Sequence, residues 1–229
     1  MNGIIVRRST NAPIRRVTAL NANKNRRFFE SGGFFTTQKG ITMAQNQTPD
    51  IRLEPVLTDE LSAYEALYLE AFPASERKPF SLLQTRAQEG KAELLSIRFD
   101  GAFAGLAVTL LHGPYVLVDY LAVAPEFRNH GIGAVVLDLL RARYPQRILF
   151  LEIEEPETEL QARRRNFYIR NGILPTGLAV TLFGVPMLIL SDGGQNVPYD
   201  DYIALLLYAA GPYTKGHVAF RGFTPPDRT

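Results

Sequence analysis

The sequence predicts one mixed α/β domain of the α+β class, in which helices flank a central mixed sheet. Three observations support this prediction. Apolar residues alternate with period two in some segments and recur at helical spacing in others, three strand-like segments follow one another through short turns, and a helical segment and another strand come after the third. These features describe an antiparallel meander followed by a β-α-β crossover, in the order β-α-α-β-β-β-α-β-α-β-β.

Strands are indicated by short apolar runs that turn residues interrupt. We expect them at residues 51–56, 92–100, 102–111, 115–123, 147–154, 173–182 and 185–190. The second and third strands should form a hairpin, because Asp100-Gly101 is a strong signal for a two-residue turn.

Helices are indicated by apolar residues three or four positions apart and by residues that favour helix ends. The first helix should begin at the N-cap residue Thr58 and end at Pro73. A second, short helix should end near Gly90, and a third should run from Ile132 until Pro145 stops it.

Two more helices are expected in the C-terminal third of the chain. Thr158-x-x-Gln161 is a capping box that opens one of them, and Gly172 suits the position just beyond its end. Residues 199–210 should form the last helix, and the tail that follows should be irregular.

The composition excludes several classes of protein. The chain has 229 residues, 46% hydrophobic and 21% charged, and no run of about 20 apolar residues that would predict a transmembrane helix. Without cysteine there is no disulfide, thiolate metal ligand or cysteine nucleophile. His112, His130 and His217 lie far apart in the sequence, so no metal site is expected.

Charge is unevenly distributed along the chain. Residues 1–42 contain eight Lys or Arg and one acid, whereas the remainder contains 17 basic and 22 acidic residues. The basic segment has the composition of an organellar transit peptide, or it is an upstream extension with Met43 as the natural start. We expect a disordered extension at 1–42, a folded domain at 43–198, and a C-terminal helix and tail at 199–229.

The location and the partners follow from the same charge pattern. We expect a cytoplasmic protein, or an organellar one if residues 1–42 are a transit peptide. A mildly acidic body does not suit nucleic-acid binding, and it would suit a cationic substrate such as an amine.

The turn Arg128-Asn129-His130-Gly131-Ile132-Gly133 lies between an apolar strand and a helix. The first turn of a helix has amide groups without intrahelical partners, and the helix dipole adds partial positive charge there. Glycines allow a diphosphate to approach the backbone closely. The turn therefore predicts an anion site, although an ordinary tight turn with a packing glycine would also explain it. A Walker A motif is excluded, since no Gly-Lys-Ser/Thr is present.

Two segments resemble the GCN5-related N-acetyltransferase (GNAT) superfamily. Leu121–Gly133 contains the family's Gln/Arg-x-x-Gly-x-Gly/Ala signature, and Asn166–Ile173 is similar to its Phe-Tyr-x-x-x-Gly-Phe segment, with Ile173 in place of the final Phe. Both come in the family's order and separation, within a resemblance that covers residues 51–191. Residues 71–77 also resemble a bacterial subgroup. The resemblance implies a GNAT-like fold, acetyl-CoA as the co-substrate, and direct attack by an amine.

The resemblance also implies roles for individual residues. Backbone amides of the turn would bind the pyrophosphate of CoA, and the strands that end at Val123 and Glu154 would splay apart to receive the acetyl group. Tyr168 would protonate the departing thiolate, since the pKa of tyrosine, about 10, is near that of an alkyl thiol. The implied cofactor-binding residues are Leu121, Ala122, Val123, Arg128, Asn129, His130, Gly131, Ile132, Gly133 and Asn166.

The base is a carboxylate whose identity the sequence leaves open. Glu152 and Glu154 share one face at the end of a central strand, where they could bind or deprotonate an amine or form a solvated strand end. Asp119 interrupts an apolar strand, which is costly without a partner. Asp119 is therefore either a catalytic residue, the partner of Arg98 in an ion pair, or an exposed residue at the rim of the sheet. Tyr120, the next residue, should point to the opposite face of the sheet.

The remaining polar groups have less specific roles. Phe72, Glu76 and Glu154 are candidate acceptor-binding residues. His130 is expected to be an exposed turn residue, and 163–165 a solvated basic face or a contact for CoA phosphates.

The sequence thus predicts an N-acetyltransferase that acts on a primary amine of a small molecule or peptide. The alternative is a CoA-binding sensor or interaction module without turnover. A homodimer through exposed strands or residues 199–210 is compatible with the sequence, which does not identify the acceptor.

Overall fold

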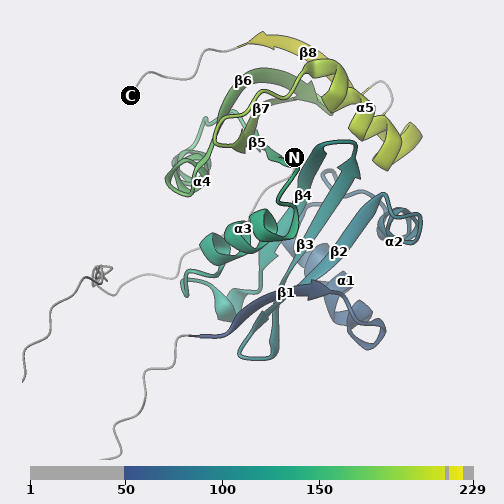
Figure 1. The fold of residues 1–229 in the computed structure, drawn as a ribbon, viewed down its shortest axis with the longest axis vertical. Coiled ribbons are helices and arrows are strands. Elements are labelled where there is room, and N and C mark those ends of the chain that lie inside the picture. The colour runs from purple at the N-terminus through teal and green to yellow at the C-terminus, as the bar shows by residue number, and fades with distance from the viewer. Residues whose placement is uncertain (1–48, 215–216, 224–229) are drawn as a thin grey trace, which may run out of the picture. The chain divides into compact units, whose positions relative to one another are not determined.

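The computed structural model describes residues 49–214 and 217–223, and its centre is an eight-stranded sheet (Figure 1). The strand order is β1-β2-β3-β4-β5-β7-β6-β8. The strands are β1 Ile51–Pro55, β2 Ala92–Phe99, β3 Ala102–His112, β4 Tyr115–Val123, β5 Ile148–Glu154, β6 Ile173–Leu182, β7 Val185–Asp192 and β8 Val218–Phe223. Neighbouring strands are antiparallel except for β4 and β5, which are parallel.

Five α-helices accompany the sheet in the described residues: α1 Leu61–Ala71, α2 Phe80–Gln88, α3 Ile132–Arg143, α4 Glu159–Arg170 and α5 Tyr199–Ala210. Short 3-10 helices occur at Thr58–Glu60, Pro125–Phe127 and Gly211–Thr214. None of these helices is both long enough and apolar enough to span a membrane. The basic extension predicted at 1–42 lies outside the described residues.

The predicted elements are confirmed in type and order, and the mixed sheet flanked by helices is the predicted fold class. The hairpin turn is also confirmed. Asp100 and Gly101 have φ values of 49° and 82°, which a two-residue turn of the primed type requires and which aspartate and glycine tolerate.

Two local predictions are wrong. Thr58 does not cap α1, because residues 58–60 form a 3-10 turn and the helix begins only at Leu61. The tail is not irregular, because it contains β8, which pairs with β6 along the sheet edge. This strand is six residues long and contains Gly222, so its own sequence gives little strand signal.

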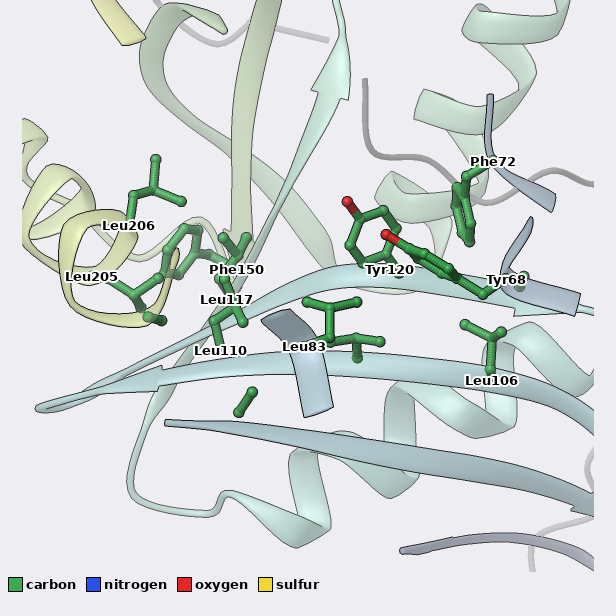
Figure 2. Close-up of a cluster of buried hydrophobic side chains, with 14 of the residues drawn as sticks. Tyr68, Phe72, Leu83, Leu106, Leu110, Leu117, Tyr120, Phe150, Leu205 and Leu206 are labelled. Atoms are coloured by element: carbon green, nitrogen blue, oxygen red, sulfur yellow. The ribbon is translucent and has the colours of Figure 1, made fainter. Parts of the chain in front are cut away.

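The two faces of the sheet carry separate hydrophobic clusters. One contains residues from α1, α2 and α5, and the other contains residues from α3 and α4. Figure 2 shows part of the first cluster, in which the rings of Tyr68, Phe72 and Tyr120 lie beside one another. Burial of these aromatic rings holds the connection between α1 and α2 against β4.

A β-bulge in β4 changes the direction of its side chains. Val108 of β3 pairs with Tyr120 and Thr109 pairs with Val118, so Asp119 is an extra residue on β4. In such a bulge the alternation between faces is interrupted. Tyr120 therefore lies on the same face as Asp119, and the prediction that it lies opposite is wrong: both side chains approach Lys78.

The end of β4 also depends on a close approach to β3. A Cβ atom on Gly105 would lie 2.4 Å from the Ala122 carbonyl oxygen and 3.1 Å from the Ile97 Cδ1 atom. Glycine is required here because backbone, rather than a movable side chain, occupies that space. The segment of β4 that leads to the turn is thus fixed by backbone contact.

The capping box of α4 is present as predicted, and it allows a stability test. Thr158 Oγ1 accepts a hydrogen bond from the Gln161 amide at 3.3 Å, and Gln161 Oε1 accepts one from the Thr158 amide at 2.9 Å. We expect Thr158→Ala to lower the free energy of unfolding by about 1 kcal/mol, because the first turn of α4 loses its acceptor. Urea unfolding measures this, and Thr158→Ser should retain most of the stability. Equal losses in both variants would contradict the capping role.

Candidate active site

β4 and β5 separate along their length, as predicted. They pair only at their first three positions, where Tyr115, Val116 and Leu117 meet residues 148–150. Beyond this point β4 pairs only with β3, and β5 only with β7. Edge backbone groups of Leu121 and Val123 therefore face the gap that opens toward the C-terminal ends of both strands, whereas those of Ala122 face β3.

The turn after β4 leads directly into α3 and presents a row of amides. Gly131 is the N-cap residue in the left-handed region at φ 74°, and Asn129 has a φ of 69°. No described residue accepts a hydrogen bond from the backbone amides of residues 129–133, including those of His130, Ile132 and Gly133. A Cβ atom on Gly131 would meet no atom within 4 Å, so the space beside the amides is open. Such a geometry fits a phosphate group.

Three other residues of this region have mainly positioning contacts. Arg128 Nε donates to the Val123 carbonyl oxygen at 3.0 Å, which joins the turn to the end of β4. His130 is exposed, as predicted, and its Nδ1 lies 3.1 Å from the Phe127 carbonyl oxygen. Gly133 packs against Phe167, whose Cζ atom would lie 3.1 Å from an added Cβ. Gly133 thus allows α3 and α4 to approach closely.

Tyr168 lies on the same helix as Phe167 and belongs to the cluster between α3, α4 and the sheet. Its side chain is 3% exposed, and its hydroxyl has no hydrogen-bond partner among the described residues. Burial raises the pKa of Tyr168 because it disfavours the tyrosinate, and the nearby Arg164 opposes this effect. Tyr168 therefore keeps its proton at neutral pH. Asn166, two residues earlier in α4, is exposed.

A buried ion pair lies at the bulge of β4. Lys78 Nζ is 2.7 Å and 2.9 Å from the two carboxylate oxygens of Asp119, and the residues are 5% and 1% exposed. The partner predicted for Asp119 is wrong, because Arg98 instead pairs with Glu60. Burial acts to lower the pKa of Lys78, but Asp119 outweighs it and raises that pKa. Lys78 is therefore protonated.

The loop that carries Lys78 is held against β4 by buried hydroxyl groups. The Lys78 amide donates to the Tyr120 hydroxyl at 2.9 Å, and that hydroxyl donates to the Glu76 carbonyl oxygen at 3.0 Å. The Tyr68 hydroxyl donates to the Lys78 carbonyl oxygen at 2.9 Å. Phe72 is buried against Tyr120, with ring centroids 4.8 Å apart, and so forms part of this wall.

Glu152 is a second buried carboxylate, on β5 and only 3% exposed. It accepts a hydrogen bond of 2.6 Å from the Tyr202 hydroxyl on α5. Burial raises the pKa of Glu152, the hydrogen bond from Tyr202 lowers it, Asp119 raises it, and Lys78 lowers it, with a net shift upward. Glu152 is thus a stronger proton acceptor than an exposed glutamate.

A half-buried group of charged side chains lies where β5 ends. Glu154 accepts a hydrogen bond of 2.7 Å from Gln161, and Arg164 Nη1 is 3.7 Å from the same carboxylate. Burial raises the pKa of Glu76, and the charge of Glu154 raises it further. Glu76 and Glu154 therefore act on each other electrostatically, although they come from different elements.

Residues 60–172 match the family model described as the acetyltransferase (GNAT) family. These residues form a GNAT acetyltransferase domain. Members of that family transfer an acetyl group from acetyl-CoA, so the domain indicates an acetyl-CoA-dependent acyltransferase. A search of curated proteins found no match.

Two solved structures resemble this GNAT chain. A GNAT-family protein from Bacteroides thetaiotaomicron is 23% identical, with a TM-score of 0.57, over 71% of this chain and 98% of its own. The spermidine N-acetyltransferase of Vibrio cholerae is 10% identical, with a TM-score of 0.50, over 62% of this chain and 92% of its own. These similarities concern the fold.

A cavity of about 460 Å³ lies at the other end of β4 and β5 in the acetyltransferase, away from the gap. Its lining groups bond to one another: Arg143 Nε donates to Glu93 at 2.6 Å, and the Tyr144 hydroxyl contacts both Glu93 and Thr109. This mutual satisfaction indicates a structural network. In the described residues no group of three or more potential metal ligands occurs.

Lys78 and Tyr202 are the polar residues of the gap that sequence reasoning missed. Lys78 lies in a polar turn, where a lysine is normally solvated, and Tyr202 lies in an apolar helix, where a tyrosine normally packs. A signal existed only for their partners, since Asp119 interrupts an apolar strand and Glu152 alternates with apolar residues.

Proposed function

We propose that this GNAT protein transfers an acetyl group from acetyl-CoA directly to a primary amine of a small molecule or peptide. Glu152 carries the proposal, because it is a buried carboxylate with a raised pKa at the gap between β4 and β5. An amine that arrives as ammonium must lose a proton before it can attack. A carboxylate in this environment is suited to accept that proton, directly or through a water molecule.

The turn from Arg128 to Gly133 supports the proposed position of the co-substrate. Its open amides and the open space beside Gly131 fit the diphosphate of CoA. The acetyl group would then reach the gap, where the backbone amides of Leu121 and Val123 can donate to its carbonyl oxygen, while Ala122 holds this segment against β3. Arg128 and Asn129 would hold the shape of the turn, and Asn166 would line its outer side.

Tyr168 is the proposed acid. As the amine nitrogen bonds to the acetyl carbonyl carbon, the thioester C–S bond breaks, and the sulfur takes the proton of the Tyr168 hydroxyl. The nitrogen, now part of the amide, loses its extra proton, which restores the Tyr168 hydroxyl through solvent. Burial keeps this hydroxyl protonated, and no described residue competes for it. Asp119 is less suited to act as a base, because Lys78 occupies both of its oxygens.

The rim of the gap supports a cationic acceptor. Glu76 and Glu154 bring negative charge to the end of β5, and Phe72 supports the loop that carries Glu76. We propose that these carboxylates attract the acceptor amine. Long-range attraction of this kind weakens as ionic strength rises.

The function is tested by thiol release from acetyl-CoA with a panel of primary amines, polyamines and peptides. We expect release with at least one amine, and a product of matching acetylated mass. CoA binding by calorimetry without release for any amine would instead support a sensor or interaction module.

Tyr168→Phe tests the proposed acid. We expect kcat to fall about 100-fold, because the thiolate loses its proton donor. The dissociation constant of CoA should stay within about twofold, because phenylalanine keeps the packing against Phe167. Steady-state kinetics and calorimetry give both values. An unchanged kcat, under conditions where chemistry limits the rate, would remove Tyr168 from the mechanism.

A further inference from the structure

The ion pair of Lys78 and Asp119 has features that stability does not explain. Both side chains are almost fully buried, with 5% and 0% of their side-chain surfaces exposed. Removing two charges from water is costly, and their attraction often does no more than repay that cost. Apolar residues would fill the same space, so the charges indicate another purpose.

The surroundings of Glu152 indicate that purpose. Among the described residues, three polar groups from three elements act on Glu152: Tyr202 from α5, Lys78 from the α1–α2 connection, and Asp119 from the β4 bulge. Tyr202 donates a hydrogen bond, Lys78 supplies a positive charge, and Asp119 supplies a negative charge. The two charges oppose each other at Glu152 and are held by the same ion pair.

The geometry keeps this arrangement fixed. The bulge puts Asp119 on the face where Lys78 approaches, and the hydroxyls of Tyr68 and Tyr120 fix the backbone of Lys78 on both sides. The ammonium also lies 5.3 Å from the centre of the Tyr120 ring. Lys78 therefore has one position relative to β4, and its distance from Glu152 does not vary freely.

We propose that Lys78 and Asp119 are positioning residues that set the pH at which Glu152 becomes a carboxylate. The proposal rests on the function proposed above only in giving Glu152 the role of base. Asp119 alone would hold the proton on Glu152, and Lys78 alone would drive it off. With both charges present, Glu152 loses its proton at a pH between these two extremes. That pH fixes the lowest pH at which the enzyme is active.

Single substitutions should move the acid limb of the pH profile in opposite directions. Activity requires deprotonated Glu152, so it is lost as pH falls through the pKa of Glu152. In Asp119→Asn the Lys78 charge loses its partner and acts on Glu152, so the limb should move about one unit or more toward acid. In Lys78→Met the two carboxyl groups share a proton, so the limb should move toward alkali. The double variant should lie between the single variants.

The kinetic measurement is kcat/KM against pH with a strongly basic amine that stays an ammonium ion across the range, so that the amine's own titration does not contribute and the limb reports the enzyme. Thermal unfolding and the dissociation constant of CoA verify that each variant is folded. Arg98→Met is the matched control, because its partner Glu60 lies in the 3-10 turn and neither residue acts on Glu152. Its limb should match that of the wild type.

A second measurement does not depend on activity. The infrared band of the protonated Glu152 carboxyl group, isolated by subtracting the spectrum of Glu152→Gln, is followed against pH in each variant. The same opposite shifts are expected. If Glu152→Gln keeps full turnover, the proposed base is wrong, but the infrared shifts still test the present inference.

Two results would overturn the inference. One is a loss of turnover in both single variants with the acid limb and the infrared transition unmoved, which a purely structural pair would produce. The other is a shift of both variants in the same direction. If Lys78→Met does not fold, Asp119→Asn decides alone, because asparagine has nearly the same shape, keeps one oxygen for Lys78 Nζ and removes the negative charge.

Discussion

Replacing Gly131 by aspartate is expected to abolish CoA binding. The side chain would enter the open space beside the amides of the turn, where the diphosphate is proposed to lie. Two unit charges about 4 Å apart at an effective dielectric constant of about 20 repel by about 4 kcal/mol, which is close to a thousandfold in the dissociation constant. Calorimetric titration with CoA measures the loss, which should shrink at high salt.

Gly131→Asn is the matched control for this substitution. Asparagine has nearly the same shape as aspartate and also tolerates the left-handed conformation at φ 74°, but it carries no charge. We expect it to lose far less affinity. Equal losses in the two variants would mean that the backbone, and not the charge, is responsible. Wild-type affinity in Gly131→Asp would disprove the phosphate site.

The features that the sequence predicts well are those encoded over a few residues. The Asp100-Gly101 turn, the capping box at Thr158 and the glycine turn before α3 each have conformations that their own side chains or φ angles determine. The meander of β2, β3 and β4 and the crossover to β5 followed from them, because short turns and one crossover leave few topologies.

The polar contacts of the gap could not be predicted, because they join distant parts of the chain. Lys78 and Asp119 are 41 residues apart, and Glu152 and Tyr202 are 50 residues apart. The β-bulge in β4 determines the contact between Lys78 and Asp119. It interrupts the alternation of β4, so that Asp119 and Tyr120 share a face, which regular alternation would not predict.

The turn after β4 and the carboxylates at the end of β5 would bind the two substrates on opposite sides of the gap. β4 ends in amides that suit an anion, and β5 ends in carboxylates that suit a cation. Parallel pairing at the start of both strands puts these ends at the same edge of the sheet. An anionic donor and a cationic acceptor can therefore meet without either crossing a surface of its own charge.

Glu152→Gln should reduce turnover about a thousandfold for an acceptor that is an ammonium ion at neutral pH. General bases contribute about 10²- to 10⁴-fold, and glutamine cannot take the proton. The Tyr202 hydroxyl can still donate to the amide oxygen, so packing and CoA affinity should be preserved. Steady-state kinetics with calorimetric CoA binding separate these effects.

The basicity of the acceptor decides whether Glu152 acts as a base or only shapes the gap. An amine that is already neutral needs no deprotonation before attack, so Glu152→Gln should lower its turnover far less than that of a strongly basic amine. A purely structural or charge-attracting residue would not produce this dependence on amine basicity. If Glu152→Gln lowers turnover by the same factor for both kinds of acceptor, Glu152 is not the base, however large that factor is.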